Sequence, residues 1–172
     1  MKCSFLSWMV VVTVTGILCP AVTVAGDRAL ARTTCRECDE VVSRVLALLP
    51  ERPEAVVVID VDRSSRSLQQ RLENVEGFVT VGTRTVCLKK QAVTFQLAMN
   101  RGGIWDYALA AIVWHEMAHI EGADETEARL RQEDLWRQFI KSRRVETGAG
   151  LRYLRALRKR HPDETRVVDA RH

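Results

Sequence analysis

The segment from Ile104 to Ile120 constrains the fold most, because apart from Asp106 near its start and three residues near its end it is apolar on every side of the helix that it would form. A helix with no polar face is buried in a protein core. Yet this segment also holds His115, Glu116 and His119. Ionisable side chains are costly to bury unless they are paired or bound to a metal ion. The sequence therefore predicts a buried helix whose ionisable groups have a specific partner.

These three residues form the pattern H-E-x-x-H, which predicts a metal site. One helical turn separates His115 from His119, so both imidazoles project from the same face and can reach one ion. Imidazole nitrogen suits zinc, and a catalytic zinc has three protein ligands with a fourth position open for water. Glu116 lies at the flank of this face, where its carboxylate can take a proton from that water and later pass it to a leaving amine.

With these residues, the stretch from Val113 to Ile120 resembles the motif helix of the zincin metallopeptidases. Glu121 departs from the family pattern, which usually has an apolar residue there. The likeness covers about residues 104–136 and implies a zinc-dependent enzyme that cleaves peptide or protein substrates. In gluzincins the third ligand is a glutamate on the next helix, in an E-x-x-A context that Glu125 and Ala128 match. The short gap is closer to that of metzincins, whose third ligand is a histidine, so the sequence assigns no subfamily.

The turn after the motif helix decides which acidic residue completes the site. Gly122 can end the motif helix in a left-handed turn, and Asp124 can cap the next helix with Glu127 completing a capping box. Glu125 would then be the first residue of that helix and point toward the motif helix. The resemblance thus implies one zinc ion held by the two histidines and Glu125, with Glu116 as the catalytic base. A shift of one residue in the helix start would exchange these roles, so Asp124 and Glu127 remain alternative ligands.

The first residues of the chain have the pattern of an export signal. Lys2 precedes an uncharged stretch over residues 3–26, and small residues near its end offer cleavage sites. We expect residues 1–31 to include a signal peptide cut between Ala25 and Ala31, which makes the protein secreted or periplasmic. The alternative is an uncleaved anchor, because residues 3–26 are just long enough to span a bilayer and would tether the protein to the membrane.

Removal of this segment leaves three cysteines, Cys35, Cys38 and Cys87. In an oxidising compartment an odd number allows at most one intramolecular disulfide. We expect it to join Cys35 to Cys38, or one of these two to Cys87. The first pair has zinc-ribbon spacing, but such a site needs a second pair of cysteines. The favoured role of this pair is therefore a structural disulfide that holds the N-terminal segment in place.

The hydrophobic pattern predicts strands first and helices afterwards, which is typical of an α+β fold. A β-branched run from Ala55 to Val61 predicts a buried strand, and two short runs within Phe78 to Leu88 predict a hairpin. Zincins bind extended peptide along an edge strand beside the motif helix, and this hairpin is the candidate. We expect a small, mainly antiparallel sheet packed on helices, with a buried motif helix and a helical C-terminal third. The expected helices span 39–49, 64–76, 106–121, 125–143 and 147–160, and residues 92–99 fit either type of element.

A chain of 172 residues with 47% hydrophobic residues can form one core but is short for two. We assign residues 32–160 to a zincin-like domain and residues 161–172 to a flexible tail. From Lys141 onward there are 10 Lys and Arg against 4 Asp and Glu. Leucines at 151, 154 and 157 would form an apolar stripe with arginines turned outward, which favours a solvated face. We expect no nucleic-acid partner.

Two functions remain open at this stage. The first is an exported zinc peptidase. The second is a non-catalytic, metal-stabilised domain that binds a partner through its basic C-terminal helix face. Glu116 favours the first, because a purely structural metal site needs no carboxylate at that position.

Overall fold

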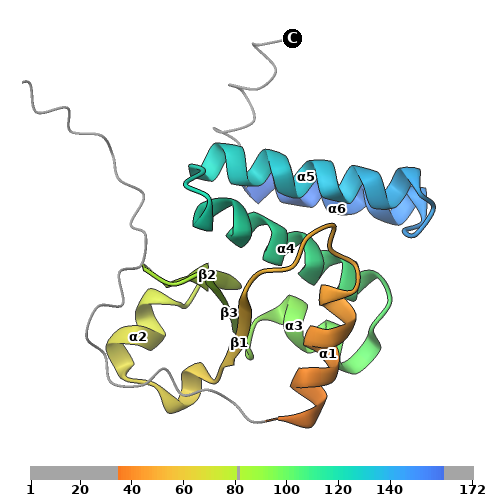
Figure 1. Cartoon of the computed structure of the whole chain (residues 1–172). Coiled ribbons are helices and arrows are strands. Elements are labelled where there is room, and N and C mark those ends of the chain that lie inside the picture. The colour runs from red at the N-terminus through yellow and green to blue at the C-terminus, as the bar shows by residue number, and fades with distance from the viewer. Residues whose placement is uncertain (1–34, 81, 161–172) are drawn as a thin grey trace, which may run out of the picture.

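The computed structural model describes residues 35–80 and 82–160 (Figure 1). The predicted signal peptide, residues 1–31, and the predicted tail, residues 161–172, lie outside the described residues. The described residues form six α-helices, a 3-10 helix and three strands. In chain order they are α1 (Arg36–Leu46), β1 (Ala55–Ile59), η1 (Val61–Arg63), α2 (Arg66–Arg71), β2 (Gly77–Val79), β3 (Thr85–Lys89), α3 (Val93–Arg101), α4 (Ile104–Ile120), α5 (Glu125–Lys141) and α6 (Thr147–Arg160).

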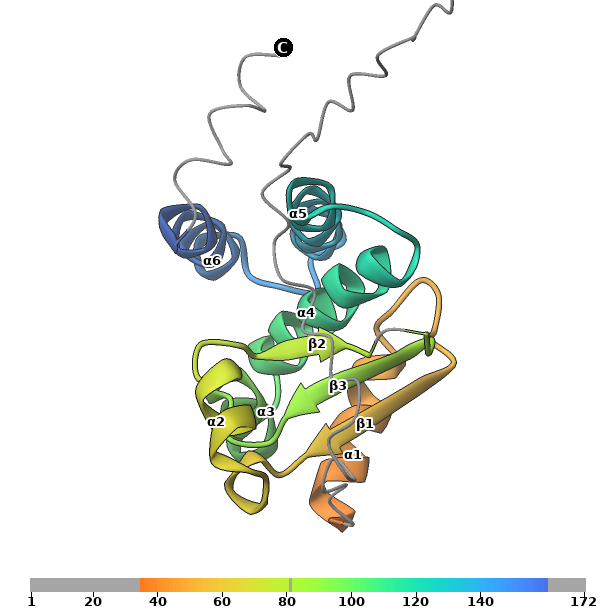
Figure 2. The ribbon, with the colours of Figure 1, turned by 90° about the vertical axis from the view of Figure 1, so that its left-hand side faces the viewer.

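Within the described residues, the strands form one mixed sheet in the order β1-β3-β2 (Figure 2). β2 and β3 are antiparallel, with Gly77 opposite Leu88 and Val79 opposite Val86, as expected for the predicted hairpin. β1 runs parallel to β3, because the chain passes through η1, α2 and β2 before β3 begins. The α+β class is confirmed, but the sheet is mixed rather than mainly antiparallel.

Alternating side chains give the sheet two buried faces. Val58, Val86 and Leu88 belong to the main core, together with buried residues of α1, α3, α4 and α5. Ile59 points to the other face and packs with Leu68 of α2 in a smaller cluster. Helices therefore cover both faces.

α4 is the central helix of the fold. Figure 2 shows it between the sheet and the layer formed by α5 and α6. Its residues 108–113 are buried, as the apolar sequence predicts. Asp106 in its first turn is paired with Arg44 of α1, which donates from both Nε and Nη2 at 3.1 Å. Apolar as α4 is, neither it nor any other helix in the described ranges combines the length and hydropathy needed to cross a membrane.

α1 begins at Arg36, earlier than the predicted start at residue 39, because a cysteine pair fixes its first turn. A disulfide joins Cys35 to Cys38, which confirms the first of the two expected pairings. The Cys35 sulfur also accepts a hydrogen bond from the Cys38 backbone N–H at 3.2 Å and so caps the helix. Cys87 is a buried thiol in β3.

Three other elements differ from the hydrophobic pattern. β1 ends at Ile59, because Val61 already begins the 3-10 helix. α2 covers only part of the predicted 64–76 segment. The ambiguous segment 92–99 is helical, and α3 extends to Arg101.

The amphipathic interpretation of α6 is partly confirmed. Leu154 and Leu157 are buried, but Leu151 is 48% exposed, so the apolar stripe is shorter than predicted. Arg158 pairs with the buried Glu133 of α5, with Nη2 donating to Oε2 at 2.8 Å. This ion pair therefore links α6 to α5, and Arg158 does not contribute to a solvated basic face.

Candidate metal centre

A tight turn after α4 leads the chain back across that helix. Gly122 has a φ of +93°, in the left-handed region that glycine adopts without strain. The N–H of Ala123 donates to the carbonyl of Ala118 at 2.9 Å, and the N–H of Gly122 donates to the carbonyl of His119 at 3.1 Å. These two bonds form a Schellman motif, which ends α4 at the predicted place.

The start of α5 separates the three candidate acidic residues. Asp124 accepts a hydrogen bond from the backbone N–H of Glu127 at 2.8 Å, so its predicted role as the helix cap is confirmed. The Glu127 carboxylate does not complete the predicted capping box, because Arg131 binds it at 2.9 Å. Arg131 also binds Glu121 at the end of α4. Glu125, the first residue of α5, is the acid that faces the motif helix.

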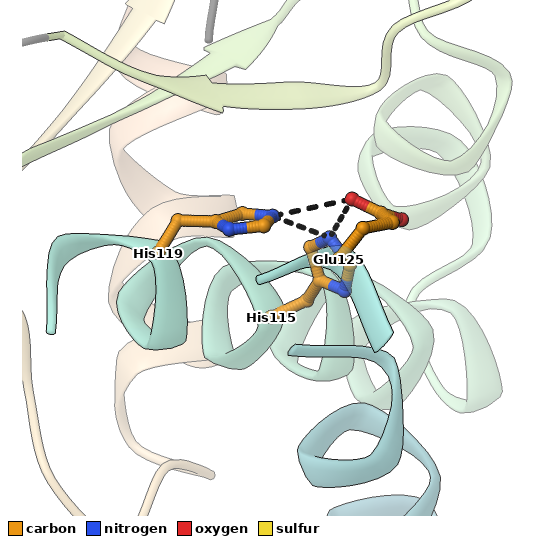
Figure 3. A group of neighbouring side chains, drawn as sticks. All are labelled: His115, His119 and Glu125. Carbon is orange, nitrogen blue, oxygen red and sulfur yellow. Dashed lines mark hydrogen bonds and ion pairs between the residues drawn. The ribbon is translucent and has the colours of Figure 1, made fainter. Parts of the chain in front are cut away.

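The structure brings His115, His119 and Glu125 together in one group that could hold a metal ion (Figure 3). The Nε2 atoms of the two histidines are 3.1 Å apart. The Oε2 atom of Glu125 lies 3.5 Å from Nε2 of His115 and 3.3 Å from Nε2 of His119. Three atoms that can each donate an electron pair therefore form a nearly equilateral triangle.

A hydrogen bond outside the triangle orients one of its two histidines. Nδ1 of His119 lies 2.9 Å from the carbonyl oxygen of Ala123, to which it can donate in the tautomer that leaves Nε2 as the ligand atom. Nδ1 of His115 is buried and has no hydrogen-bond partner within the described residues. The Schellman turn thus both ends α4 and holds one imidazole.

Arg129 is a member of the site that the sequence prediction missed. Its side chain is only 13% exposed, and its Nη2 atom donates to Oε1 of Glu125. This bond leaves Oε2 of Glu125 directed at the histidines. In the sequence, Arg129 follows the acidic Glu125 by four positions on a predicted helix. This spacing of an acidic and a basic residue is too common to single out a functional pair.

The members of the group shift one another's pKa values. The hydrogen bond to Glu125 has the largest effect on His119 and raises its pKa to about 8 against the effect of burial. Burial tends to raise the pKa of Glu125, but hydrogen bonds from His115 and His119 outweigh burial and hold the pKa well below its usual range. Glu125 is therefore a carboxylate, which is the form that binds a metal ion.

Glu116 is buried beside this group, against the edge of the sheet. Its residue is 8% exposed, and burial raises the pKa of its carboxyl above the usual value, with His115 and His119 acting in the opposite direction. Gly77 of β2 lies on the sheet face toward α4. A Cβ atom at Gly77 would lie 3.2 Å from Cγ of Glu116 and 3.2 Å from Cγ2 of Ile112. Glycine therefore lets the strand backbone approach Glu116, and no local sequence pattern predicts this contact.

Gly77→Ala is expected to destabilise the protein by about 1–3 kcal/mol, because the added methyl group overpacks the contact between β2 and α4. Replacing glycine by alanine also lowers the conformational entropy of the unfolded chain, which stabilises the folded protein by about 0.4–1 kcal/mol. The cost of overpacking exceeds this gain. Urea unfolding of the single variants and of the double variant Gly77→Ala/Glu116→Ala measures the coupling. The cost should fall when Glu116 is truncated; an equal cost in both backgrounds would show that the two residues are not in contact.

The candidate group opens onto a cleft of about 750 Å³. His115, Glu116 and Glu125 line it. One wall consists of α3 with Gly77 and the residues before it, the opposite wall belongs to α5 and α6, and α4 supplies the floor. A ligand at this end of the cleft can contact both Glu116 and His115, because both residues line it.

Each predicted site residue is thus accounted for in the structure. His115, His119 and Glu125 form the candidate metal group, and Glu116 lies next to it in the same cleft. Asp124 and Glu127 have other partners. No protein-family model, curated protein or solved structure matches this chain.

Proposed function

We propose that this protein is a zinc-dependent peptidase in which His115, His119 and Glu125 hold one zinc ion. The observation that carries the proposal is the triangle of donor atoms, whose sides are 3.1, 3.3 and 3.5 Å. Two ligand atoms of a tetrahedral zinc ion, each at about 2.0–2.1 Å from the metal, are about 3.3–3.4 Å apart. The three side chains therefore have the spacing of three corners of a zinc tetrahedron.

The chemistry of the donors supports zinc and a catalytic role. Two imidazole nitrogens and one carboxylate oxygen are a ligand set of catalytic zinc, which leaves the fourth corner for water or substrate. His115 and Glu125 both line the cleft, so this corner would be accessible to a substrate. A zinc ion bound here would supply a water molecule of lowered pKa and polarise a substrate carbonyl.

Glu116 would act as the general base and then as the general acid. Its carboxylate lies in the same cleft and follows the ligand His115 directly in the chain. Burial raises its pKa, which brings a carboxyl closer to the range in which it can both accept and return a proton near neutral pH. In this role Glu116 takes a proton from the attacking water and gives it to the leaving amine.

The edge of the sheet supports a peptide as the substrate. In the sheet of the described residues β2 is an edge strand, and Gly77 at its start lines the cleft. Extended peptide can bind to such an edge through main-chain hydrogen bonds. The sequence pattern of residues 1–31 and the disulfide between Cys35 and Cys38 both favour an exported enzyme.

The experiment that tests this function is digestion of a peptide library by the zinc-loaded protein, with the Glu116→Gln protein as the control. The alternative, a metal-stabilised binding domain without turnover, predicts one bound zinc and no cleavage by either protein. This alternative needs a basic face on α6. Because Arg158 is paired with Glu133, that face carries less positive charge than the sequence indicates.

A further inference from the structure

The cleft extends from the candidate metal group along one direction of α4. On the floor, the lining residues of α4 recur every three or four positions, from Trp105 through Ala108 and Ile112 to His115. In the described chain, no residue of α4 after Glu116 lines this cleft. The floor is therefore about 15 Å long at 1.5 Å per helical residue. An extended peptide of about four or five residues has the same length at 3.3 Å per residue.

Apolar side chains line this arm of the cleft. Val93 and Leu97 come from one face of α3, and Leu157 comes from α6 on the opposite wall. Val93 is 68% exposed and, with Leu151, is one of the two exposed large hydrophobic residues in the described part of the chain. An apolar surface that is open to solvent within a cleft indicates a binding site for an apolar ligand.

Two charged residues of the lining, Glu76 and Arg129, have partners in the structure. Arg129 binds Glu125, and Glu76 accepts hydrogen bonds from the Thr94 hydroxyl at 2.9 and 3.0 Å. A peptide in this arm of the cleft would meet apolar side chains on α3 and α4, whereas the carboxylate of Glu116 lies at the end next to the candidate metal group.

We propose that this arm of the cleft binds a run of apolar residues on one side of the scissile bond, and that Val93 is a specificity-determining residue. The proposal rests on the peptidase function for the scissile bond, but the binding of an apolar peptide does not require cleavage. The substrate segment is about four or five residues long, because the floor of the arm ends at Ile104 and Trp105, the first residues of α4.

The chain offers a matched pair of variants to test this. Val93→Asp places a charge at the first residue of α3, where the helix dipole tolerates it because the first turn has no acidic residue. Leu151→Asp makes the same kind of change at the other exposed hydrophobic residue, which does not line the cleft. Both changes remove exposed apolar surface, so neither is expected to unfold the protein.

The probe is a dansylated peptide amide with four consecutive leucines, compared with the same peptide carrying four serines. Fluorescence anisotropy measures binding to the zinc-loaded Glu116→Gln protein, which cannot consume the peptide. The leucine peptide should bind more tightly than the serine peptide. Val93→Asp should weaken leucine-peptide binding by about tenfold, because it puts a carboxylate against an apolar chain. Leu151→Asp should leave it unchanged.

Equal binding of the two peptides, or equal effects of the two aspartate variants, would overturn the proposal. Mass spectrometry of peptides digested by the wild-type protein maps the cleavage sites. This second measurement distinguishes an error in the proposed apolar specificity from an error in the proposed peptidase function. Cleavage without an apolar preference on one side of the bond would refute the specificity and leave the peptidase intact. Leucine-selective binding without any cleavage would refute the peptidase and leave the apolar cleft intact.

Discussion

Replacement of Glu116 by glutamine is expected to lower the rate of peptide hydrolysis by about 10²–10⁴-fold, because the amide cannot accept a proton from water. The change is nearly isosteric, and Glu116 is not a member of the candidate metal group. Zinc content and thermal stability should therefore remain close to those of the wild-type protein. The rate is measured on a peptide that the wild-type protein cleaves, together with elemental analysis of both proteins.

Glu121→Gln is a matched control for this experiment. Glu121 lies at the end of the same helix, but it pairs with Arg131 and does not line the cleft. Its replacement should leave the hydrolysis rate unchanged. If the Glu116→Gln protein hydrolysed the peptide at the wild-type rate, Glu116 would not be the general base and the proposed mechanism would be wrong.

Glu125→Ala is expected to weaken zinc binding by at least about 100-fold, more than the loss of a residue that only supports a ligand. Asp124→Ala should keep the zinc affinity and cost about 0.5–2 kcal/mol of stability, because it removes the cap of α5. Glu127→Ala should have little effect on either, since its carboxylate only pairs with the exposed Arg131. Competition with a chromophoric chelator measures the affinity, and urea unfolding measures the stability.

Arg129→Met extends this series to the residue behind the ligand. It keeps the length of the side chain but removes the bond to Oε1 of Glu125, so the zinc affinity should fall by about 10–100-fold. The effect should disappear when Glu125 is already alanine. Full zinc affinity in Glu125→Ala, with a loss in Glu127→Ala or Asp124→Ala, would show that another acid completes the site.

The centre of the site was predictable from the sequence because local rules determine it. The spacing of His115 and His119 places both imidazoles on one helical face, and the turn residues after α4 specify where α5 begins. Asp124 caps that helix as predicted, so the position of Glu125 follows from local geometry. The buried helix was predictable for the same reason, since its apolar sequence leaves it no solvent face.

The rest depended on contacts between distant segments. The parallel pairing of β1 with β3 arises from a crossover, and a short β-branched run does not specify its partner strand. The contact of Gly77 with Glu116 joins a strand and a helix through the absence of a side chain, for which the sequence has no signal. α1 begins before residue 39, where the hydrophobic pattern predicts its start, because the disulfide at Cys35 fixes its first turn. The hydrophobic pattern contains no information about this disulfide.

Zinc K-edge X-ray absorption of the purified protein, loaded with one equivalent of zinc, tests the central claim most directly. The proposed site predicts nitrogen and oxygen neighbours at about 2.0–2.1 Å, with the outer-shell scattering of two imidazole rings and no sulfur near about 2.3 Å. The Glu125→Ala protein should lose one oxygen neighbour or replace it by water. A sulfur shell would place the zinc on cysteines, and a shell of six oxygens would show only a hydrated ion. Either spectrum would contradict a metal centre built from His115, His119 and Glu125.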